Sequence, residues 1–245
     1  MESQNIVVMG KNMHYLTEGK GKTLLFLHGV PGTSDMWIPI MSLVSSQAQC
    51  IAVDLIGMGK SDKPKLDYSI DDHVLFLKGF IDSLGLDYFT LVLNGWGSIV
   101  GLEYARQYPD KIAGLVFTEA YLRLEKDHQN ISLFFEKLKQ LEKNESEKLK
   151  MMLTHAFWKT LEDNPYVNPN SPVIPVIENY SAWLEQAPNK KLLLYGGSGF
   201  LTTRAAANWA IKTLPNITAV DLGIEATTLS GVMAQKFSEA LLGWL

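Results

Sequence analysis

The sequence predicts an α/β fold built around a mainly parallel β-sheet. Three observations lead to this class. Short apolar runs typical of buried strands recur along the chain, segments with the 3.6-residue period of amphipathic helices separate them, and this alternation resumes near the C-terminal end. Parallel strands joined by helices in this way are covered on both faces of the sheet. A chain of 245 residues is also long enough to bury a core without disulfides.

Eight segments have the pattern of strands. IVVMG and MHYLTEG, separated by Lys11 and Asn12, predict an N-terminal hairpin. The continuous apolar run at 24–28 is of the buried-strand type, and further strands are expected at 51–55, 89–93, 112–117, 192–196 and 217–222. We therefore expect a mostly parallel eight-stranded sheet flanked by helices.

Four segments between or after these strands have the period of helices. They are 35–46, 71–84, 99–108 and 232–244, and Pro109 ends the third. In the second, the apolar residues are expected to share one face of the helix: Val74, Leu75, Leu77, Ile81 and Leu84.

One long segment, 122–185, contains no convincing strand. Its stretch FFEKLKQLEKNESEKLKMML has a helical period, and NPYVNPNSPVIP is rich in turn residues. Because it interrupts the sheet, we expect a helical insertion that forms a cap (lid) over the carboxyl ends of the strands, where open α/β sheets bind ligands. The chain would then divide into a core, 1–121 and 186–245, and a cap, 122–185.

Composition excludes several classes of function. The net charge of −4 gives no basic surface for nucleic acid, and no run of 18 apolar residues could span a membrane. The first residues lack the layout of a signal peptide, so we expect a cytoplasmic protein. The single cysteine, Cys50, excludes an internal disulfide. No metal-ligand spacing or phosphate-binding glycine loop is present, so we expect no metal and no cofactor. The oligomeric state is not indicated.

Three motifs carry a resemblance to a known family. HGVPGTSDMW (28–37), DLIGMGKSDKP (54–64) and LNGWGSIVGLEYARQYPDKIAGLVFTEA (93–120) resemble the haloalkane dehalogenase branch of the α/β-hydrolases, to which Renilla-type luciferase also belongs. NYSAWLEQAPNKKLLLYGGSGFLTT (179–203) is similar to that family's segment after the cap. The resemblance covers about residues 10 to 245. It implies an α/β-hydrolase fold with a shortened helical cap.

The resemblance also implies a set of catalytic groups that this chain mostly lacks. Dehalogenases of this family use an aspartate nucleophile at a strand-to-helix elbow, a histidine base, a carboxylate that orients it, and two halide donors. Gly95 stands at the position of the nucleophile, Val30 at that of one donor and Thr227 at that of the base. The second donor, Trp96, and a carboxylate, Glu119, are retained. No histidine follows His155, so a shift of the alignment does not restore the base.

Other groups at this site are expected to persist. The backbone N–H groups of Val30 and Trp96 correspond to an oxyanion hole, which side-chain changes do not remove. Glu119 is either an acid or base or a carboxylate bonded to the neighbouring backbone. Ser98 and His28 are interpreted as structural. The resemblance places a set of residues at the substrate: Asn94, Gly95, Trp96, Trp37, Tyr121, Phe200, Leu201 and Thr227.

Three functions remain open. The first is a non-hydrolytic, cofactor-free enzyme, a cyclase, lyase or isomerase, acting on an apolar small molecule by cavity shape and the oxyanion hole. The second is a catalytically inactive small-molecule-binding protein. The third is a weak hydrolase that uses Ser98 or a bound water. The first is favoured, because a pure binding protein has little reason to keep Glu119 in an apolar cavity.

Overall fold

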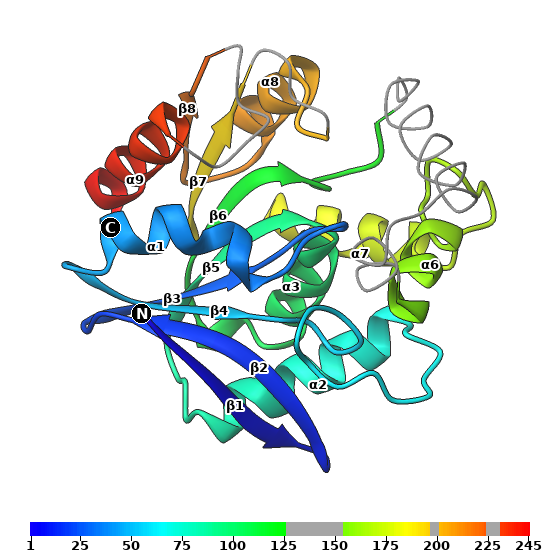
Figure 1. Cartoon of the computed structure of the whole chain (residues 1–245). Helices are drawn as coiled ribbons and strands as arrows, with labels where there is room; N and C mark the ends of the chain where they lie inside the picture. The colour runs from blue at the N-terminus through cyan, green and yellow to red at the C-terminus, as the bar shows by residue number, and fades with distance from the viewer. Residues whose placement is uncertain (126–153, 197–200, 224–230) are drawn as a thin grey trace.

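One sheet of eight strands organises the protein (Figure 1). The computed structural model describes residues 1–125, 154–196, 201–223 and 231–245. The strand order is β1-β2-β4-β3-β5-β6-β7-β8, and only the pairs β1–β2 and β2–β4 are antiparallel. The strands are β1 (Glu2–Val8), β2 (Lys11–Glu18), β3 (Lys22–Leu27), β4 (Ala48–Val53), β5 (Phe89–Gly95), β6 (Ile112–Ala120), β7 (Lys190–Tyr195) and β8 (Ile217–Asp221). The predicted mostly parallel eight-stranded sheet is confirmed.

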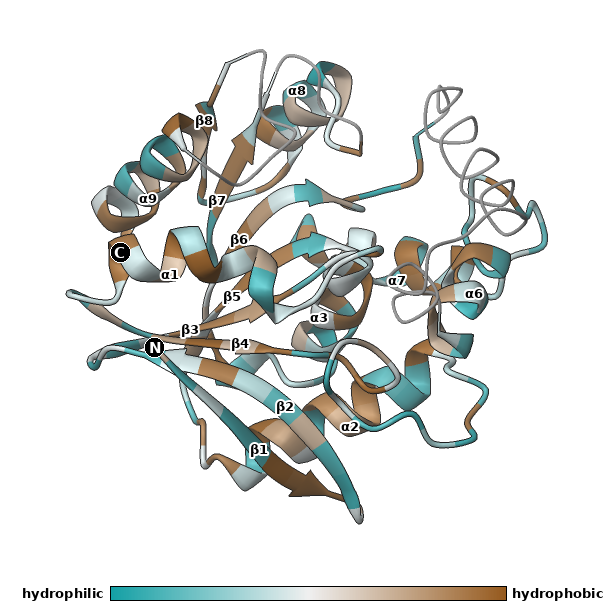
Figure 2. Cartoon of the chain, viewed as in Figure 1, coloured by the Kyte–Doolittle hydropathy of each residue, from teal (hydrophilic) through white to brown (hydrophobic). Residues whose placement is uncertain are grey.

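Helices cover both faces of this sheet. On one face, α1 (Ile38–Val44) and α9 (Val232–Trp244) pack together over a cluster that includes Phe26. The other face carries α2 (Ile70–Ser83), α3 (Trp96–Gln107) and α8 (Arg204–Thr213). Two short 3-10 helices, η1 (Ser34–Trp37) and η2 (Pro109–Lys111), precede α1 and β6. Figure 2 shows the central strands β3 and β5 as largely hydrophobic, which is the pattern expected of strands buried on both sides.

Local sequence signals explain where α2 begins. The Ser69 side chain accepts a hydrogen bond from the Asp72 N–H, and the Asp72 carboxylate accepts one from the Ser69 N–H. This capping box satisfies two backbone donors that a helix start otherwise leaves free. The prediction that Leu75 shares an apolar face with Val74 is wrong, because the Leu75 side chain is 48% exposed and Val74 is buried. It lies about 100° around the helix from Val74 and so leaves the buried face.

The N-terminal hairpin exists, but its turn differs from the prediction. Val8 pairs with Lys11, so the turn is Met9–Gly10 rather than Lys11–Asn12. Both turn residues have positive φ, 52° for Met9 and 74° for Gly10. Tight hairpins favour this backbone because its twist matches that of the strands, and glycine adopts it without strain.

The described parts of the predicted insertion, 122–125 and 154–185, contain turns and two helices and no strand. The helices are α6 (His155–Glu162) and α7 (Ile174–Leu184), and α7 packs against α3. Figure 1 shows α6 on the side toward which β5 and β6 run. The charged stretch at 134–153 lies outside the described residues. Within the described chain, no helix has both the length and the apolar character needed to cross a bilayer.

Candidate functional site

The turn between β5 and α3 is the geometric centre of the site. Its residue is Gly95, with φ 49° and ψ −128°. A side chain strains this backbone region, which glycine enters freely. Gly95 is also crowded: a Cβ built on it would lie 2.9 Å from the Cα of Gly29. The sharp strand-to-helix turn expected for this fold is therefore present, and it is packed closely against the loop after β3.

A β-bulge faces this turn from the neighbouring strand. Asn94 pairs with Thr118 but Gly95 pairs with Ala120, so Glu119 is the extra residue of β6. Glu119 has a φ of 44°, in the left-handed region that residues with side chains rarely adopt. Bulges of this kind re-aim side chains next to functional sites. Two neighbouring strands thus both depart from regular geometry at the same end of the sheet.

Glu119 binds the backbone directly before α8. Its Oε2 atom accepts hydrogen bonds from the N–H of Leu201 at 2.6 Å and from the N–H of Thr202 at 3.3 Å. The residue is half-buried rather than enclosed. Two N–H donors stabilise the ionised form of a carboxylate. The geometry therefore corresponds to the second expectation for Glu119, a carboxylate bonded to nearby backbone.

The two expected oxyanion-hole donors lie on either side of Gly95. Trp96 is the first residue of α3, so its N–H has no acceptor within the helix. The Val30 N atom lies 3.7 Å from the position a Cβ on Gly95 would take. Among the hydrogen bonds of the described residues, neither backbone N–H donates to a protein acceptor. Both N–H groups can therefore donate to a ligand atom. Donors of this kind act best when the protein fixes their positions before the ligand arrives.

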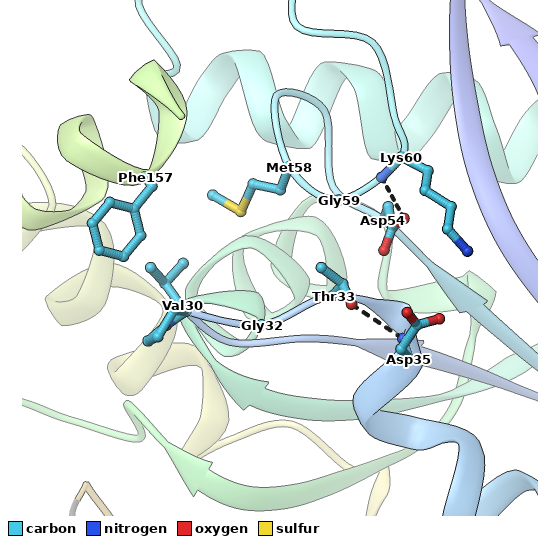
Figure 3. Close-up of a pocket in the computed structure, with 10 residues that line it drawn as sticks. Val30, Gly32, Thr33, Asp35, Asp54, Met58, Gly59, Lys60 and Phe157 are labelled. Atoms are coloured by element: carbon cyan, nitrogen blue, oxygen red, sulfur yellow. Dashed lines mark hydrogen bonds between the residues drawn. The ribbon is translucent and has the colours of Figure 1, made fainter. Parts of the chain in front are cut away.

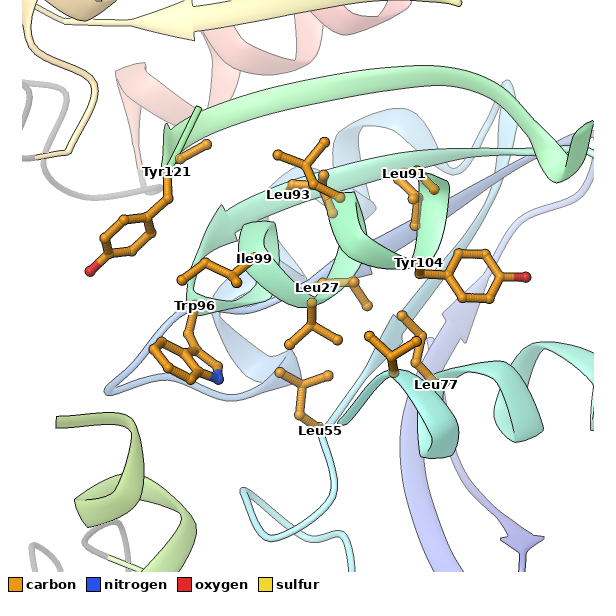
Figure 4. Close-up of a cluster of buried hydrophobic side chains, with 14 of the residues drawn as sticks. Leu27, Leu55, Leu77, Leu91, Leu93, Trp96, Ile99, Tyr104 and Tyr121 are labelled. Atoms are coloured by element: carbon orange, nitrogen blue, oxygen red, sulfur yellow. The ribbon is translucent and has the colours of Figure 1, made fainter. Parts of the chain in front are cut away.

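The indole of Trp96 is a third donor. The residue is 3% exposed, and its Nε1 has no hydrogen-bond partner within the part of the chain that is described. Figure 4 shows Trp96 at one end of a buried cluster with Leu55 and Ile99, with Tyr104 at the other end. An unpaired buried N–H costs about 1–3 kcal/mol. A ligand acceptor at this position would remove that penalty.

Ser98 is committed to structural hydrogen bonds. Its hydroxyl donates to the Gly95 carbonyl at 2.6 Å and accepts from the Tyr121 N–H at 2.9 Å, and the residue is fully buried. Tyr121 continues this connection into the 154–184 segment. Its carbonyl accepts from the Tyr180 hydroxyl at 2.5 Å, and its own hydroxyl accepts from Asn164 at 2.8 Å. Ser98 and Tyr121 therefore join the turn to α7.

The loops after β3 and β4 are fixed by buried polar groups. His28 is fully buried, its Nδ1 lies 2.9 Å from the Gly29 carbonyl, and its Nε2 accepts from the Leu55 N–H at 3.1 Å. Burial lowers the pKa of His28, although the Asp54 carboxylate and the Gly29 carbonyl oppose this. A neutral ring is what accepting from Leu55 requires. His28 is thus a structural loop residue, as the sequence suggested.

A small pocket lies between these loops (Figure 3). Its volume is about 220 Å³. Four of its lining residues have apolar side chains, four have polar or charged ones and two are glycines: Val30, Pro31, Gly32, Thr33, Asp35, Asp54, Met58, Gly59, Lys60 and Phe157. Figure 3 shows Met58 and Phe157 near Val30, and Asp35 and Lys60 at the other end. This combination suits a small ligand with an apolar part and a polar end.

The chain is similar to proteins of known family. Residues 22–219 match the family described as alpha/beta hydrolase fold. The chain is 30% identical to a haloalkane dehalogenase of Mesorhizobium japonicum over 277 residues, which covers 98% of this chain and 90% of that protein. The chain belongs to the α/β-hydrolase family and is haloalkane dehalogenase-like. This dehalogenase-like chain is also 28% identical to a haloalkane dehalogenase of Agrobacterium fabrum, across 100% of its own length and 91% of the relative.

Solved structures agree in fold with the dehalogenase-like chain. Haloalkane dehalogenase DbeA from Bradyrhizobium elkani superposes with a TM-score of 0.85 at 25% identity, covering 99% of this chain and 97% of that one. DatA from Agrobacterium tumefaciens gives 0.81 at 23% identity, covering 100% and 97%. The alignment to the Agrobacterium fabrum relative spans 279 positions against 245 residues here, so that relative has segments with no counterpart in this chain.

Not every predicted site residue is brought together in the dehalogenase-like chain. Six predicted residues lie around the turn: Asn94, Gly95, Trp96, Glu119, Tyr121 and Leu201. None of these six lines the pocket, whereas Val30 does. Trp37 lies elsewhere: it is fully buried on the α1–α9 face, with its ring 5.2 Å from that of Phe26. Phe200 and Thr227 lie outside the described residues.

Two residues that line the pocket, Met58 and Phe157, were not among the predicted site residues. Met58 lies within the DLIGMGKSDKP motif, which identified the family but gave no position for that side chain. Phe157 comes from α6, and only tertiary packing brings it to the loops. In the described residues, no group of three or more His, Cys, Asp or Glu side chains is arranged to hold a metal ion.

Proposed function

We propose that this dehalogenase-like hydrolase has lost the family's covalent chemistry and acts on an apolar small molecule without a nucleophile. Gly95 replaces the aspartate, Thr227 replaces the histidine, and the reaction is an elimination, cyclisation or isomerisation. Its rate would come from positioning and from fixed dipoles. The segment 122–185 serves as the cap over the ligand.

The packing of Gly95 carries this proposal. Its φ of 49° is the conformation in which the family's fold exposes a nucleophile, yet a Cβ there would lie 2.9 Å from Gly29. Real Cβ atoms do not approach a backbone carbon so closely, so a nucleophilic side chain requires the loop after β3 to shift. The turn keeps its form and lacks the reactive atom.

Three hydrogen-bond donors supply the electrostatic part of the proposed reaction. The N–H groups of Val30 and Trp96 and the indole N–H of Trp96 are available to a ligand oxygen that gains negative charge. Losing one donor of this kind reduces the rate about 10²–10³-fold in other enzymes. Besides accepting from the Leu201 and Thr202 N–H groups, Glu119 has a second role in this mechanism, as the base that removes a proton from the substrate.

The alternatives differ in what they require. A protein that only binds its ligand needs the same pocket and donors but no base, so Glu119 distinguishes it. The hydrolase alternative with Ser98 as nucleophile is disfavoured, because that hydroxyl donates its single proton to the Gly95 carbonyl and is fully buried. The hydrolase alternative to be tested is therefore attack by a bound water.

The experiment begins with native mass spectrometry of the purified protein to identify a retained small molecule. That molecule is then supplied to fresh protein in ¹⁸O-labelled water. A product without ¹⁸O supports the proposal, and an unchanged molecule supports the binding protein. A product that carries ¹⁸O means hydrolysis and overturns the proposal. Conversion of a terminal haloalkane to halide and an ¹⁸O-labelled alcohol overturns it as well.

A pair of variants assigns the activity to the site. Glu119→Gln keeps the size of the side chain and is expected to reduce product formation at least 100-fold while ligand retention persists. Glu178→Gln is the control, because Glu178 is an exposed residue of α7. Full activity of Glu119→Gln would remove this carboxylate from the mechanism.

A further inference from the structure

Three polar side chains at the open edge of the sheet have the order of a serine nucleophile, a base and an orienting carboxylate. Ser3 Oγ lies 2.8 Å from Nε2 of His14, and Nδ1 of His14 lies 2.8 Å from Oδ2 of Asp54. β1 is the edge strand, β2 is its neighbour, and Asp54 follows β4 (Figure 1). None of these residues belongs to the turn at Gly95, and Asp54 also lines the pocket of Figure 3. Four strand spacings separate β1 from β5, or about 19 Å.

The strand register brings Ser3 over His14. Asn5 pairs directly with His14, and Ser3 is two residues further along the same face of β1. Diagonal neighbours of this kind are within reach of a long side chain. His14 is 2% exposed, whereas Ser3 is exposed. The base is thus protected from solvent and the hydroxyl is accessible.

Asp54 fixes the protonation pattern of this group. Besides His14, its carboxylate accepts from the N–H of Ser34 at 2.6 Å and the N–H of Lys60 at 2.9 Å, the latter drawn in Figure 3. Burial raises the pKa of Asp54, but the polar surroundings at His28 and the hydrogen bonds from these N–H donors outweigh it, and the pKa lies below its ordinary value. An ionised Asp54 only accepts, so in neutral His14 the proton sits on Nδ1. The Nε2 lone pair then accepts from the Ser3 hydroxyl, as in a serine nucleophile paired with its base.

We propose that Ser3, His14 and Asp54 form a nucleophilic serine site that takes electrophilic acyl or phosphoryl groups with good leaving groups. Ser3 Oγ bonds to the carbonyl carbon or phosphorus, the bond from that atom to the leaving group breaks, and the hydroxyl proton passes to His14 Nε2. The leaving group or solvent then takes this proton. Because Ser3 is exposed, water surrounds the developing oxyanion, and this restricts the site to activated electrophiles.

The test uses an alkyl fluorophosphonate on the native protein, with peptide mass spectrometry to locate the label. The Oγ–phosphorus bond forms, the phosphorus–fluorine bond breaks, and the proton leaves with fluoride. Ser46 is also exposed and serves as the internal control. We expect at least tenfold higher initial labelling of Ser3 than of Ser46, and loss of that preference in urea. Equal labelling of the two serines in the native protein would overturn the proposal.

Two variants complete the test. Ser3→Ala is expected to remove the label, and His14→Gln to reduce labelling of Ser3 to the level of Ser46. Labelling of Ser3 that is unchanged in a folded His14→Gln protein would show that the imidazole does not act as base. The comparison with Ser46 in the unsubstituted protein does not depend on either variant folding. Label on Ser98 would instead support the hydrolase alternative at the central turn, so the two sites are distinguished.

Discussion

Gly95→Ala tests the central structural claim with a single methyl group. The substitution adds only a Cβ, at a φ of 49° and 2.9 Å from the Gly29 Cα. Strain at such a backbone position costs about 1–3 kcal/mol, and forcing an extra carbon into a packed site costs roughly 1–3 kcal/mol more. We therefore expect the free energy of unfolding to fall by about 2–6 kcal/mol.

Gly85→Ala is the matched control for this prediction. Gly85 has a similar φ of 63°, but a Cβ there would meet no atom within 4 Å. Its loss should therefore be the backbone strain alone, about 1–3 kcal/mol. Urea unfolding followed by tryptophan fluorescence measures both, with equal m-values as the check that the two-state analysis holds. If Gly95→Ala loses no more stability than Gly85→Ala, the crowding by Gly29 is unimportant and a nucleophile could be accommodated.

Three further substitutions test buried polar side chains. Burial lowers the pKa of His73 to about 4. The unfolded chain therefore binds a proton near pH 6.5 while the folded one does not, and stability falls by roughly 3 kcal/mol from pH 6.5 to 4. His73→Phe should flatten this fall in urea titrations across that range, and an unchanged slope would refute the assignment. Lys191→Met should lower the free energy of unfolding by at least about 3 kcal/mol, since the buried ammonium donates to the carbonyls of Ala187, Asn189 and Pro215; thermal unfolding that is unaffected would contradict it. Trp96→Phe should leave stability unchanged or slightly higher, yet weaken the retained ligand about tenfold in a binding titration, and equal affinity would show that the indole N–H is not a ligand contact.

The sheet could be predicted from sequence because its signal is local. A buried parallel strand is a continuous apolar run, so 24–28 and 89–93 are visible without any knowledge of their partners. The final helix was predicted at the bounds the structure has, Val232–Trp244. Departures occur where a side chain does not decide the backbone. The predicted hairpin turn was two residues too far along the chain, since the turn is Met9–Gly10. Helix α8 was not predicted, because its buried face consists mainly of alanines.

The site was predictable in part for a similar reason. Motif positions located Gly95, Trp96 and Glu119, which do lie together at the end of the sheet. The sequence could not reveal that Glu119 occupies a bulge and holds Leu201 and Thr202, because that contact spans 82 residues of chain. Trp37 is next to a site motif in sequence, but its side chain points to the opposite face of the sheet. A residue's position next to a motif shows which part of the fold it belongs to, but not the face of the sheet toward which its side chain points.

The hydrogen bonds of Ser98 and Tyr121 have a consequence for engineering. Tyr180 and Asn164 hold Tyr121, Tyr121 holds Ser98, and Ser98 holds the Gly95 carbonyl. A redesign of α7 or its preceding loop for a new ligand would therefore also displace the centre of the site. Libraries aimed at altered selectivity should keep Tyr180 and Asn164 fixed and vary Met58 and Phe157, which shape the pocket without this linkage.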